Sequence, residues 1–457
     1  MTFLQTRSLA PLGLGMTCGL GLGMTCVMLS LCIVPPAHAE PRVRGSDPVE
    51  RASATLSQNL AAQQAEQDRL AQARALELAL QQQRAFNLAL QTVITQELGQ
   101  GSVEWLAGRS DPLVTGFTPI PGREGLLVSY QIPAGDSLSA LAGRSWTYDN
   151  AAGAVAFLSE GRADLARSVL SALQGLMASD GTLGYSYQVD STFVDSRVRT
   201  GTLAWVGYAM ALYQRMTGDS SFQTSAERIG GYLRTLQGPT GSLRGGPDVS
   251  WTSTEHNIDG YFFYRELYRV TGNAGYLQTA NQIKGSLLAN HWVKVSNNSG
   301  YFLQGLNDPT PSLDANSWGA IFLWAVGRTT EAGQALKYVE QKFKNSQVIT
   351  GSSTRVTGYA PDTARRTVWL EGTLGVATAY QRLGSTSKAD SILGNVYKVQ
   401  QVWSSQGRWH GALPYAMPRY TNTDGDTFSD LESVPSTAWL LITQSVREGG
   451  SPFWDHD

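Results

Sequence analysis

The densest group of chemically competent side chains lies in the segment WTSTEHNIDGYFFY, which begins at Trp251. If this segment is helical, Glu255 and Asp259 stand four residues apart and share one face, which His256 flanks. Two close carboxylates raise the pKa of one of them, and a raised carboxyl pKa suits a general acid. The alternative interpretation is a capped helix start with a satisfied histidine.

Further acidic residues stand beside aromatic residues at equivalent places along the chain. Counting back thirteen positions from the turn glycine of each of four hairpins aligns Tyr148, Trp205, Asp259 and Glu371. An unpaired carboxylate inside a helix is costly, so Asp259 and Glu371 should pair with a cation or line a watered cavity. Helix capping explains single acids such as Asp149, Asp259 or Asp314 but not their recurrence beside Trp and Tyr.

The elements that must position these residues form a repeat, which starts at Trp146. Two amphipathic stripes lie 54 positions apart and predict outer helices: Phe222, Ala226, Ile229 and Leu233, and Tyr276, Ala280, Ile283 and Leu287. Each follows a Thr-Gly turn, and before the turn comes a more uniformly apolar helix, GTLAWVGYAMALYQ or NIDGYFFYRELYRV. A helix that is apolar all round must be buried on all sides, so these segments are predicted to be inner helices.

Looser copies of the unit predict further helix pairs. These are 150–158 with 165–177, 315–326 with 332–343, and 369–383 with 388–402. The last inner helix, 434–446, is not followed by an outer partner in the sequence. An earlier helix, such as the end of the segment 76–98, could close the ring.

Several outer helices are followed by loops rich in Gly and aromatic residues: DGTLGYSY, TGSLRGGP, NNSGYFLQG and QGRWHGALPY. With these loops, the segments YDNAAGAVAFL, WTSTEHNIDGYFFY, LDANSWGAIFLW, VWLEGTLGVATAY and SVPSTAWLLI resemble successive inner helices of the six-hairpin glycosidase superfamily. The resemblance covers roughly residues 125–457 and implies an all-α fold, the (α/α)6 six-hairpin toroid. It specifies the fold more than the activity, because the superfamily also contains lyases, epimerases and proteins without known catalysis.

In such a toroid, one set of inner-helix ends points into a common funnel, where distant polar residues converge. Glycoside hydrolysis needs one protonated and one ionised carboxyl group. We expect Glu255 to be the acid, Asp149 or Glu371 its ionised partner, and Asp259 a positioning group. The predicted sugar-binding residues are Tyr148, Trp146, Trp251, His256, Asn257, Asp314, Trp318, Tyr359 and Trp369.

The sequence therefore predicts an exported carbohydrate-active protein, a glycoside hydrolase whose partner is a polysaccharide or oligosaccharide. A lyase or epimerase on the same fold would use His256 and a tyrosine as base and acid. A third possibility is a non-catalytic glycan-binding or envelope-assembly protein, because the chain has an N-terminal helical segment and lacks an unmistakable catalytic pair.

Composition argues against other chemistries. The net charge is −2 and Lys and Arg are scattered, so nucleic acid is not an expected partner. No cofactor is expected, since no phosphate-binding or dinucleotide fingerprint precedes a helix. No metal is expected either. Asn422, Asp424, Asp426 and Asp430 have calcium-loop spacing, but Thr427 and Ser433 replace the turn glycine and the final glutamate.

The N-terminal part is predicted to contain three segments before the toroid domain at 146–457. Residues 1–39 resemble a cleavable signal peptide ending in Ala-His-Ala, which predicts a periplasmic or secreted protein. The alternative is an uncleaved membrane anchor. All three cysteines (Cys18, Cys26 and Cys32) lie in this segment, so the mature protein would have no thiol. Residues 48–100 predict a helical spacer or packed helix, and 101–145 a Gly/Pro-rich connection with a strand near 125–132.

Export predicts a mature chain that begins at about Glu40. N-terminal sequencing of the protein from the periplasmic or culture fraction checks this expectation. A chain that keeps its first residues in a membrane fraction would favour the anchor.

Overall fold

The computed structural model describes residues 47–408, 410–423, 425–449 and 451–456. The predicted signal peptide and its three cysteines lie outside these residues. The chain divides into two units, 1–83 and 84–457, and helix α1 (Pro48–Gly108) runs through the boundary. Side chains at 47–83 are exposed throughout. Within the described ranges, no helix combines the length and apolar character needed to cross a membrane.

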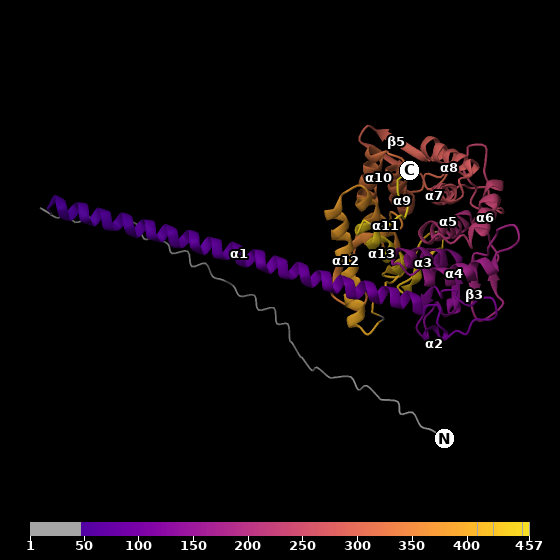
Figure 1. Cartoon of the computed structure of the whole chain (residues 1–457), viewed down its shortest axis with the longest axis horizontal. Coiled ribbons are helices and arrows are strands. Elements are labelled where there is room, and N and C mark those ends of the chain that lie inside the picture. Colours follow the sequence, from indigo (N-terminus) through magenta and orange to yellow (C-terminus); the bar gives the residue numbers. More distant parts are fainter. Residues whose placement is uncertain (1–46, 409, 424, 450, 457) are drawn as a thin grey trace, which may run out of the picture. The chain divides into compact units, whose positions relative to one another are not determined.

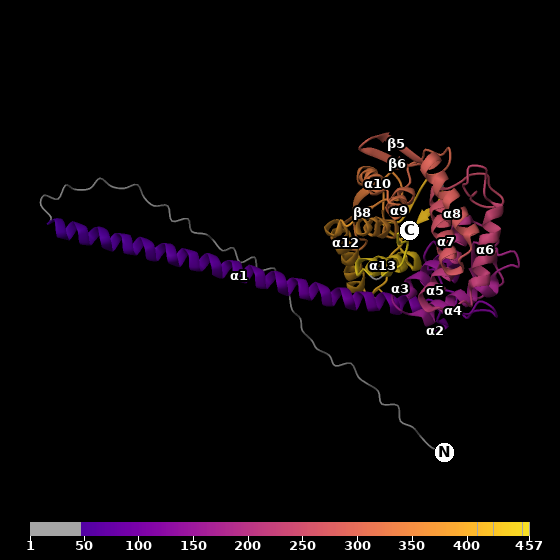
Figure 2. The ribbon, with the colours of Figure 1, turned by 45° about the horizontal axis from the view of Figure 1, so that its top comes forward.

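The second unit is built on a closed ring of six inner helices, whose members are almost entirely buried. They are α3 (Thr147–Ser159), α5 (Thr200–Thr217), α7 (Thr254–Thr271), α9 (Leu313–Ala325), α11 (Leu370–Arg382) and α13 (Val434–Arg447). Each packs against the next, and α13 packs against α3 (Figures 1 and 2). The expected six-hairpin toroid is confirmed.

Outer helices cover this ring and bury only one stripe each. They are α4 (Ala163–Leu176), α6 (Gln223–Thr235), α8 (Ala274–Ser286), α10 (Thr329–Lys342) and α12 (Thr386–Ser405). In α6 the buried stripe contains Ala226, Ile229 and Leu233, as the sequence period predicts. The turns at Gly218 and Gly272 end α5 and α7 with left-handed φ angles of 75° and 68°, which glycine adopts without strain.

The sixth outer position is taken by the C-terminal part of α1. Ser102, Trp105 and Leu106 are buried, and Ser102 Oγ donates a hydrogen bond of 2.7 Å to the Gly411 carbonyl. The prediction that the helix ends near residue 100 was wrong, because residues 101–108 are helical. Gly101 does not break the helix; it permits close packing, since a Cβ there would lie 2.6 Å from His410 Cδ2.

Short antiparallel strand pairs fill the connections on one side of the ring. They are β1 (Tyr130–Gln131) with β13 (Glu432–Ser433), β2 (Arg144–Trp146) with β3 (Ser186–Gln188) and β4 (Val194–Asp195), β5 (Trp292–Ser296) with β6 (Ser299–Phe302), β7 (Lys344–Val348) with β8 (Arg355–Tyr359), β9 (Val368–Trp369) with β10 (Ala416–Met417), and β11 (Tyr420–Thr421) with β12 (Thr427–Phe428). The strand expected over 125–132 is limited to β1. A single turn of helix, α2 (Pro112–Thr115), follows α1.

A repeated side-chain clamp ties each loop to the inner helix that follows it. Asn316 Oδ1 accepts a 2.8 Å hydrogen bond from the Phe302 amide, and its Nδ2 donates to the Phe302 carbonyl at 3.1 Å. Asn257 makes the same pair of bonds to Leu243. Thr373 accepts from the Tyr359 amide at the equivalent position of α11. The clamp satisfies buried backbone groups and sets the height of each loop over the ring.

Asn316→Ala should lower the free energy of unfolding by about 1–3 kcal/mol, because the Phe302 amide and carbonyl lose a buried partner. Urea unfolding followed by circular dichroism measures this change. As a control, exposed Asn298→Ala should change the stability by less than about 0.5 kcal/mol. Equal effects at both positions would show that the clamp contributes nothing specific.

Candidate active site

Five carboxylates lie near the N-terminal ends of four inner helices. Asp149 comes from α3, Glu255 and Asp259 from α7, Asp314 from α9, and Glu371 from α11. The ring brings these helix ends together. As a result, the charges of Asp314, Asp259 and Glu371 act on Glu255, and those of Asp149 and Asp314 act on Glu371. The closed ring therefore converts separate positions in the sequence into one acidic cluster.

Burial raises the pKa of several members of this cluster. It raises the pKa of Asp149 to about 7. For Glu371, burial and then the charges of Asp149 and Asp314 raise the pKa to about 8, against the hydrogen bond from Tyr148. Burial, followed by the charges of Asp314 and Asp259, also holds the pKa of Glu255 well above its usual range. These groups are poised to hold and exchange protons near neutral pH.

The inner part of the cluster contains the four residues that the thirteen-position count aligns. The Tyr148 hydroxyl donates to Glu371 Oε1, and Trp205 Nε1 donates to Asp259 Oδ1 at 3.0 Å. The rings of Tyr148 and Trp205 meet edge to face, with centroids 5.2 Å apart. Trp439, which the sequence interpretation missed, donates its Nε1 hydrogen to the Tyr148 oxygen at 3.0 Å.

The outer part is formed by Glu255, Asp314 and His256, which keep part of their surface exposed. A hydrogen bond joins the side chains of Glu255 and Asp314. The cap of α7 is Ser253, whose Oγ accepts from the His256 amide at 3.3 Å, so the Glu255 carboxyl is not needed as a cap. Capping does account in part for Asp314, which accepts from the Ala315 amide at 2.7 Å.

His256 packs against Trp251, with ring centroids 5.5 Å apart. Burial lowers the pKa of His256 to about 4, and the charge of Arg199 lowers it further in the same direction. The imidazole is therefore neutral at ordinary pH. Gly201 lies against it, because a Cβ at Gly201 would stand 2.4 Å from His256 Cδ2. Trp251 is 47% exposed, which leaves its ring available to a ligand.

Three tyrosines that the sequence interpretation missed surround the acids. Tyr130, Tyr185 and Tyr415 are half-buried, and burial followed by the charge of Asp149 or Glu371 raises their pKa. For Tyr185, burial and then the charges of both Asp149 and Glu255 raise the pKa. The Gly/aromatic loops DGTLGYSY and QGRWHGALPY contain Tyr185 and Tyr415, so this loop signal could have identified them.

Other predicted site residues lie in different surroundings. Asn257 is fully buried and serves as a loop clamp. Tyr359 is buried too, and its hydroxyl donates to Glu340 of α10 at 2.6 Å, away from the acids. These two are therefore not positioned to touch a sugar. Trp318 lies in the centre of the ring, stacked on Trp439 at 5.3 Å.

The two remaining aromatic candidates lie in the loop layer. Trp146 is half-buried, and its ring meets that of Tyr130 edge to face at 5.5 Å. Trp369 is buried between Tyr415 and Phe428. Only Trp146 of this pair offers part of its surface to a ligand.

The described part of the chain contains no group of three or more His, Cys, Asp or Glu residues placed to hold a metal ion. In the predicted calcium-like loop, Asp426 accepts from Asn422 Nδ2 at 3.1 Å and Asp430 pairs with Arg419 at 2.8 Å. Asp424 lies outside the described residues. These acids are engaged within the β11–β12 hairpin and its neighbours.

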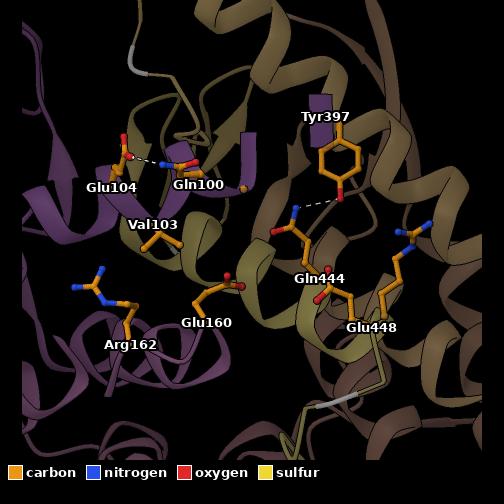
Figure 3. Close-up of a pocket in the computed structure, with 10 residues that line it drawn as sticks. Gln100, Val103, Glu104, Glu160, Arg162, Tyr397, Gln444 and Glu448 are labelled. Atoms are coloured by element: carbon orange, nitrogen blue, oxygen red, sulfur yellow. Dashed lines mark hydrogen bonds between the residues drawn. The ribbon is translucent and has the colours of Figure 1, made fainter. Parts of the chain in front are cut away.

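A separate pocket of about 440 Å³ lies beside the C-terminal ends of the inner helices α3 and α13 (Figure 3). In this pocket the Tyr397 hydroxyl accepts a 3.1 Å hydrogen bond from Gln444 Nε2. Burial, and then the charge of Glu448, raises the pKa of Glu160 to about 7. A second pocket lies between α10, α11 and α12. Neither pocket is lined by a member of the carboxylate cluster.

Comparisons with solved structures agree with this architecture. A protein described as a glycosidase superposes with a TM-score of 0.56 at 13% identity, covering 78% of this chain and 97% of its own. A family 76 glycoside hydrolase (mannosidase) from Bacteroides thetaiotaomicron gives 0.54 at 13%, covering 77% and 98%. An α-amylase from Clostridium perfringens gives 0.51 at 10%, covering 70% and 92%.

No protein-family model matches the sequence, and no curated protein matches it either. At such low identities the structural likeness establishes the fold alone. The second unit thus has the six-hairpin glycosidase fold, with a carboxylate cluster at the N-terminal ends of its inner helices.

Asp149→Asn should make the free energy of unfolding less sensitive to rising pH. The Asp149 pKa is about 7 in the folded chain, against about 3.9 for an unfolded one, so only the unfolded chain loses this proton between those values. The contribution of Asp149 to stability therefore falls as the pH rises through this window, by at most about 1.4 kcal/mol per pH unit, and this contribution is constant above the window.

Urea unfolding at several pH values between about 4 and 8 measures the slope for wild type and variant. The wild type should lose more stability than Asp149→Asn across the window. Exposed Asp190→Asn serves as the control and should keep the wild-type slope. Parallel curves for wild type and Asp149→Asn would contradict the inferred proton on Asp149.

Proposed function

We propose that this protein hydrolyses glycosidic bonds in a polysaccharide or oligosaccharide. The observation that carries the proposal is the cluster of five carboxylates, ringed by Trp and Tyr side chains, in which burial raises the pKa of Asp149 to about 7 and that of Glu371 to about 8, and holds the pKa of Glu255 and Asp259 well above their usual range. Hydrolysis of an acetal needs a carboxyl group that is still protonated at the working pH and a second, ionised one. The likeness to glycoside hydrolases supports the fold on which this chemistry would run.

Glu255 is the proposed general acid. Burial and the neighbouring acids raise its pKa, which favours the protonated form that a general acid needs, and its carboxyl is hydrogen-bonded to Asp314. Part of its surface is exposed, in contrast to Asp259 and Glu371, which are only 3% exposed. A glycosidic oxygen can therefore reach Glu255 more easily than the inner acids.

Asp149 is the proposed ionised partner. Its pKa of about 7 suits a general base at neutral pH, and its charge acts on Tyr185, as does that of Glu255. Glu371 is the other candidate, but its pKa is about 8 and the Tyr148 hydroxyl occupies one of its oxygens. Glu371 and Asp259 then act as positioning groups at the base of the cluster.

The half-exposed aromatic residues supply stacking faces for sugar rings. Trp251 is the most exposed of them and lies beside His256, while Trp146, Tyr148 and Tyr185 lie nearer to Asp149. Aromatic rings pack against the apolar faces of sugars, and their polar edges bind hydroxyl groups. Such a lining favours a neutral chain of sugars as the ligand.

The lyase or epimerase alternative is less well supported. It would use His256 as the base, but a histidine with a pKa of about 4 is a weak proton acceptor. A product that absorbs in the ultraviolet, formed without net hydrolysis, would favour this alternative. Binding that survives loss of all five carboxylates, with no turnover, would favour a non-catalytic glycan-binding protein.

We also propose that the protein acts outside the cytoplasm, on the basis of the sequence of residues 1–39. A cleavable signal at this end would deliver residues 40–457 to the periplasm or the medium. Polysaccharides of the cell surface are accessible there. The first experiment is therefore a polysaccharide panel assayed with purified residues 40–457 for release of reducing ends.

Glu255→Gln should lower turnover by roughly two to four orders of magnitude, the usual worth of a positioned proton donor. The fold and ligand binding should be kept, because glutamine has the size and shape of the protonated carboxyl that the raised pKa of Glu255 favours. Turnover and melting temperature are measured on the same sample. Glu227→Gln on outer helix α6 is the control and should keep full activity.

Near-normal turnover in Glu255→Gln would remove Glu255 from the catalytic pair. Asp149→Asn and Glu371→Gln assayed alongside then show which of the other acids carries the reaction.

A further inference from the structure

The segment 451–456 enters the ring from the end opposite to the carboxylates. It contacts the C-terminal halves of the inner helices: Tyr208 and Arg215 of α5, Arg265 and Arg269 of α7, Trp324 of α9, and Arg382 of α11. Figures 1 and 2 mark this end of the chain (C) close to α9. The segment therefore lies beneath the carboxylate cluster, along the axis of the ring.

Two aromatic residues of the segment fill the middle of the ring. Phe453 and Trp454 are 0% and 1% exposed. Trp454 stacks on Phe262 at 4.6 Å with nearly parallel rings and lies 5.4 Å from Trp205. Phe453 contacts Trp205 at 5.9 Å and Trp439 at 5.5 Å. The segment thus packs directly against Trp205, which binds Asp259, and against Trp439, which binds Tyr148.

Charged groups hold the segment in place. Asp455 accepts from Arg215 at 3.0 Å, from Arg265 at 2.9 Å and from Arg269. Burial alone would raise the pKa of Asp455, but the arginines outweigh it and hold this pKa below its usual value. Arg382 donates to the Phe453 carbonyl. A carboxylate among three guanidinium groups forms a strong, oriented anchor.

A chain of contacts leads from this anchor to the acids. The indole N–H of Trp205 binds Asp259, and that of Trp439 binds Tyr148, which in turn binds Glu371. Each indole N–H stays directed at its acceptor only while other side chains pack against the remaining surface of the ring. Phe453 and Trp454 provide that support, so a vacancy at their place would let both indoles rotate.

We propose that segment 451–456 is a positioning element of the carboxylate site, with Phe453, Trp454 and Asp455 as its positioning residues. It acts through Trp205 and Trp439, which fix Asp259 and Tyr148. The effect on turnover rests on the proposed hydrolytic function, but the effect on the two indoles does not. The experiment therefore measures both.

The test uses protein labelled with ¹⁵N at the indole nitrogens, which contains 12 tryptophans in the full chain. Trp205→Phe and Trp439→Phe assign the two resonances. Trp454→Leu removes the support, and Asp455→Asn weakens the anchor without removing a ring. Phe222→Leu is the control, because Phe222 is a buried aromatic residue that packs on Tyr213 instead. Circular dichroism and melting temperature are recorded for each protein.

Exchange of the Trp205 and Trp439 indole hydrogens with water should become at least about tenfold faster in Trp454→Leu and Asp455→Asn, and stay unchanged in Phe222→Leu. Turnover should fall roughly ten- to a hundredfold in Trp454→Leu, with KM changed by less than about threefold. If Trp454→Leu does not fold, Asp455→Asn alone decides.

Wild-type exchange of both indoles in the folded variants would overturn the proposal and leave the segment a purely structural one. If the wild-type protein turns over no substrate, the proposed hydrolysis fails, while the exchange rates still decide the positioning role.

Discussion

The packing of tryptophans on the axis of the ring is the interaction on which the rest of the structure depends. Six helices that surround one axis leave a central space that only large side chains can fill. Trp205, Trp318 and Trp439 fill it, and all three are almost fully buried. Because an indole has one polar edge, two of these residues also donate hydrogen bonds: Trp205 to Asp259 and Trp439 to Tyr148. Core packing and site geometry therefore share the same atoms.

The close approach of the inner helices requires small residues at the contacts. A Cβ at Gly207 would lie 2.4 Å from Phe263 Cε2, and one at Gly375 would lie 2.8 Å from Trp318 Nε1. These glycines lower helix propensity, and the large aromatic partners that they admit compensate through buried area. The glycines and their aromatic partners depend on each other, since a larger residue in place of a glycine would exclude the aromatic side chain.

The tight packing of the ring also affects the carboxylates. Carboxylates that share a buried site repel each other, and the fold bears this cost by keeping protons on some of them. Indole and phenol donors hold Asp259 and Glu371 on the inner side, while Glu255 and Asp314 share a hydrogen bond on the outer side. Sites that store unfavourable electrostatics in this way are typically the functional ones.

From the sequence alone, the repeat, the two kinds of helix and the alignment of Tyr148, Trp205, Asp259 and Glu371 could be determined, because hydrophobic period and turn glycines act over short distances. The end of α1 was misplaced, since Gly101 serves a contact with His410 that is distant in sequence. Closure of the helix ring brings three further parts of the chain to the site or its support: Tyr130, Trp439 and the segment 451–456. Only the tertiary structure could decide their roles, because their partners are fixed by helices that meet from hundreds of residues away.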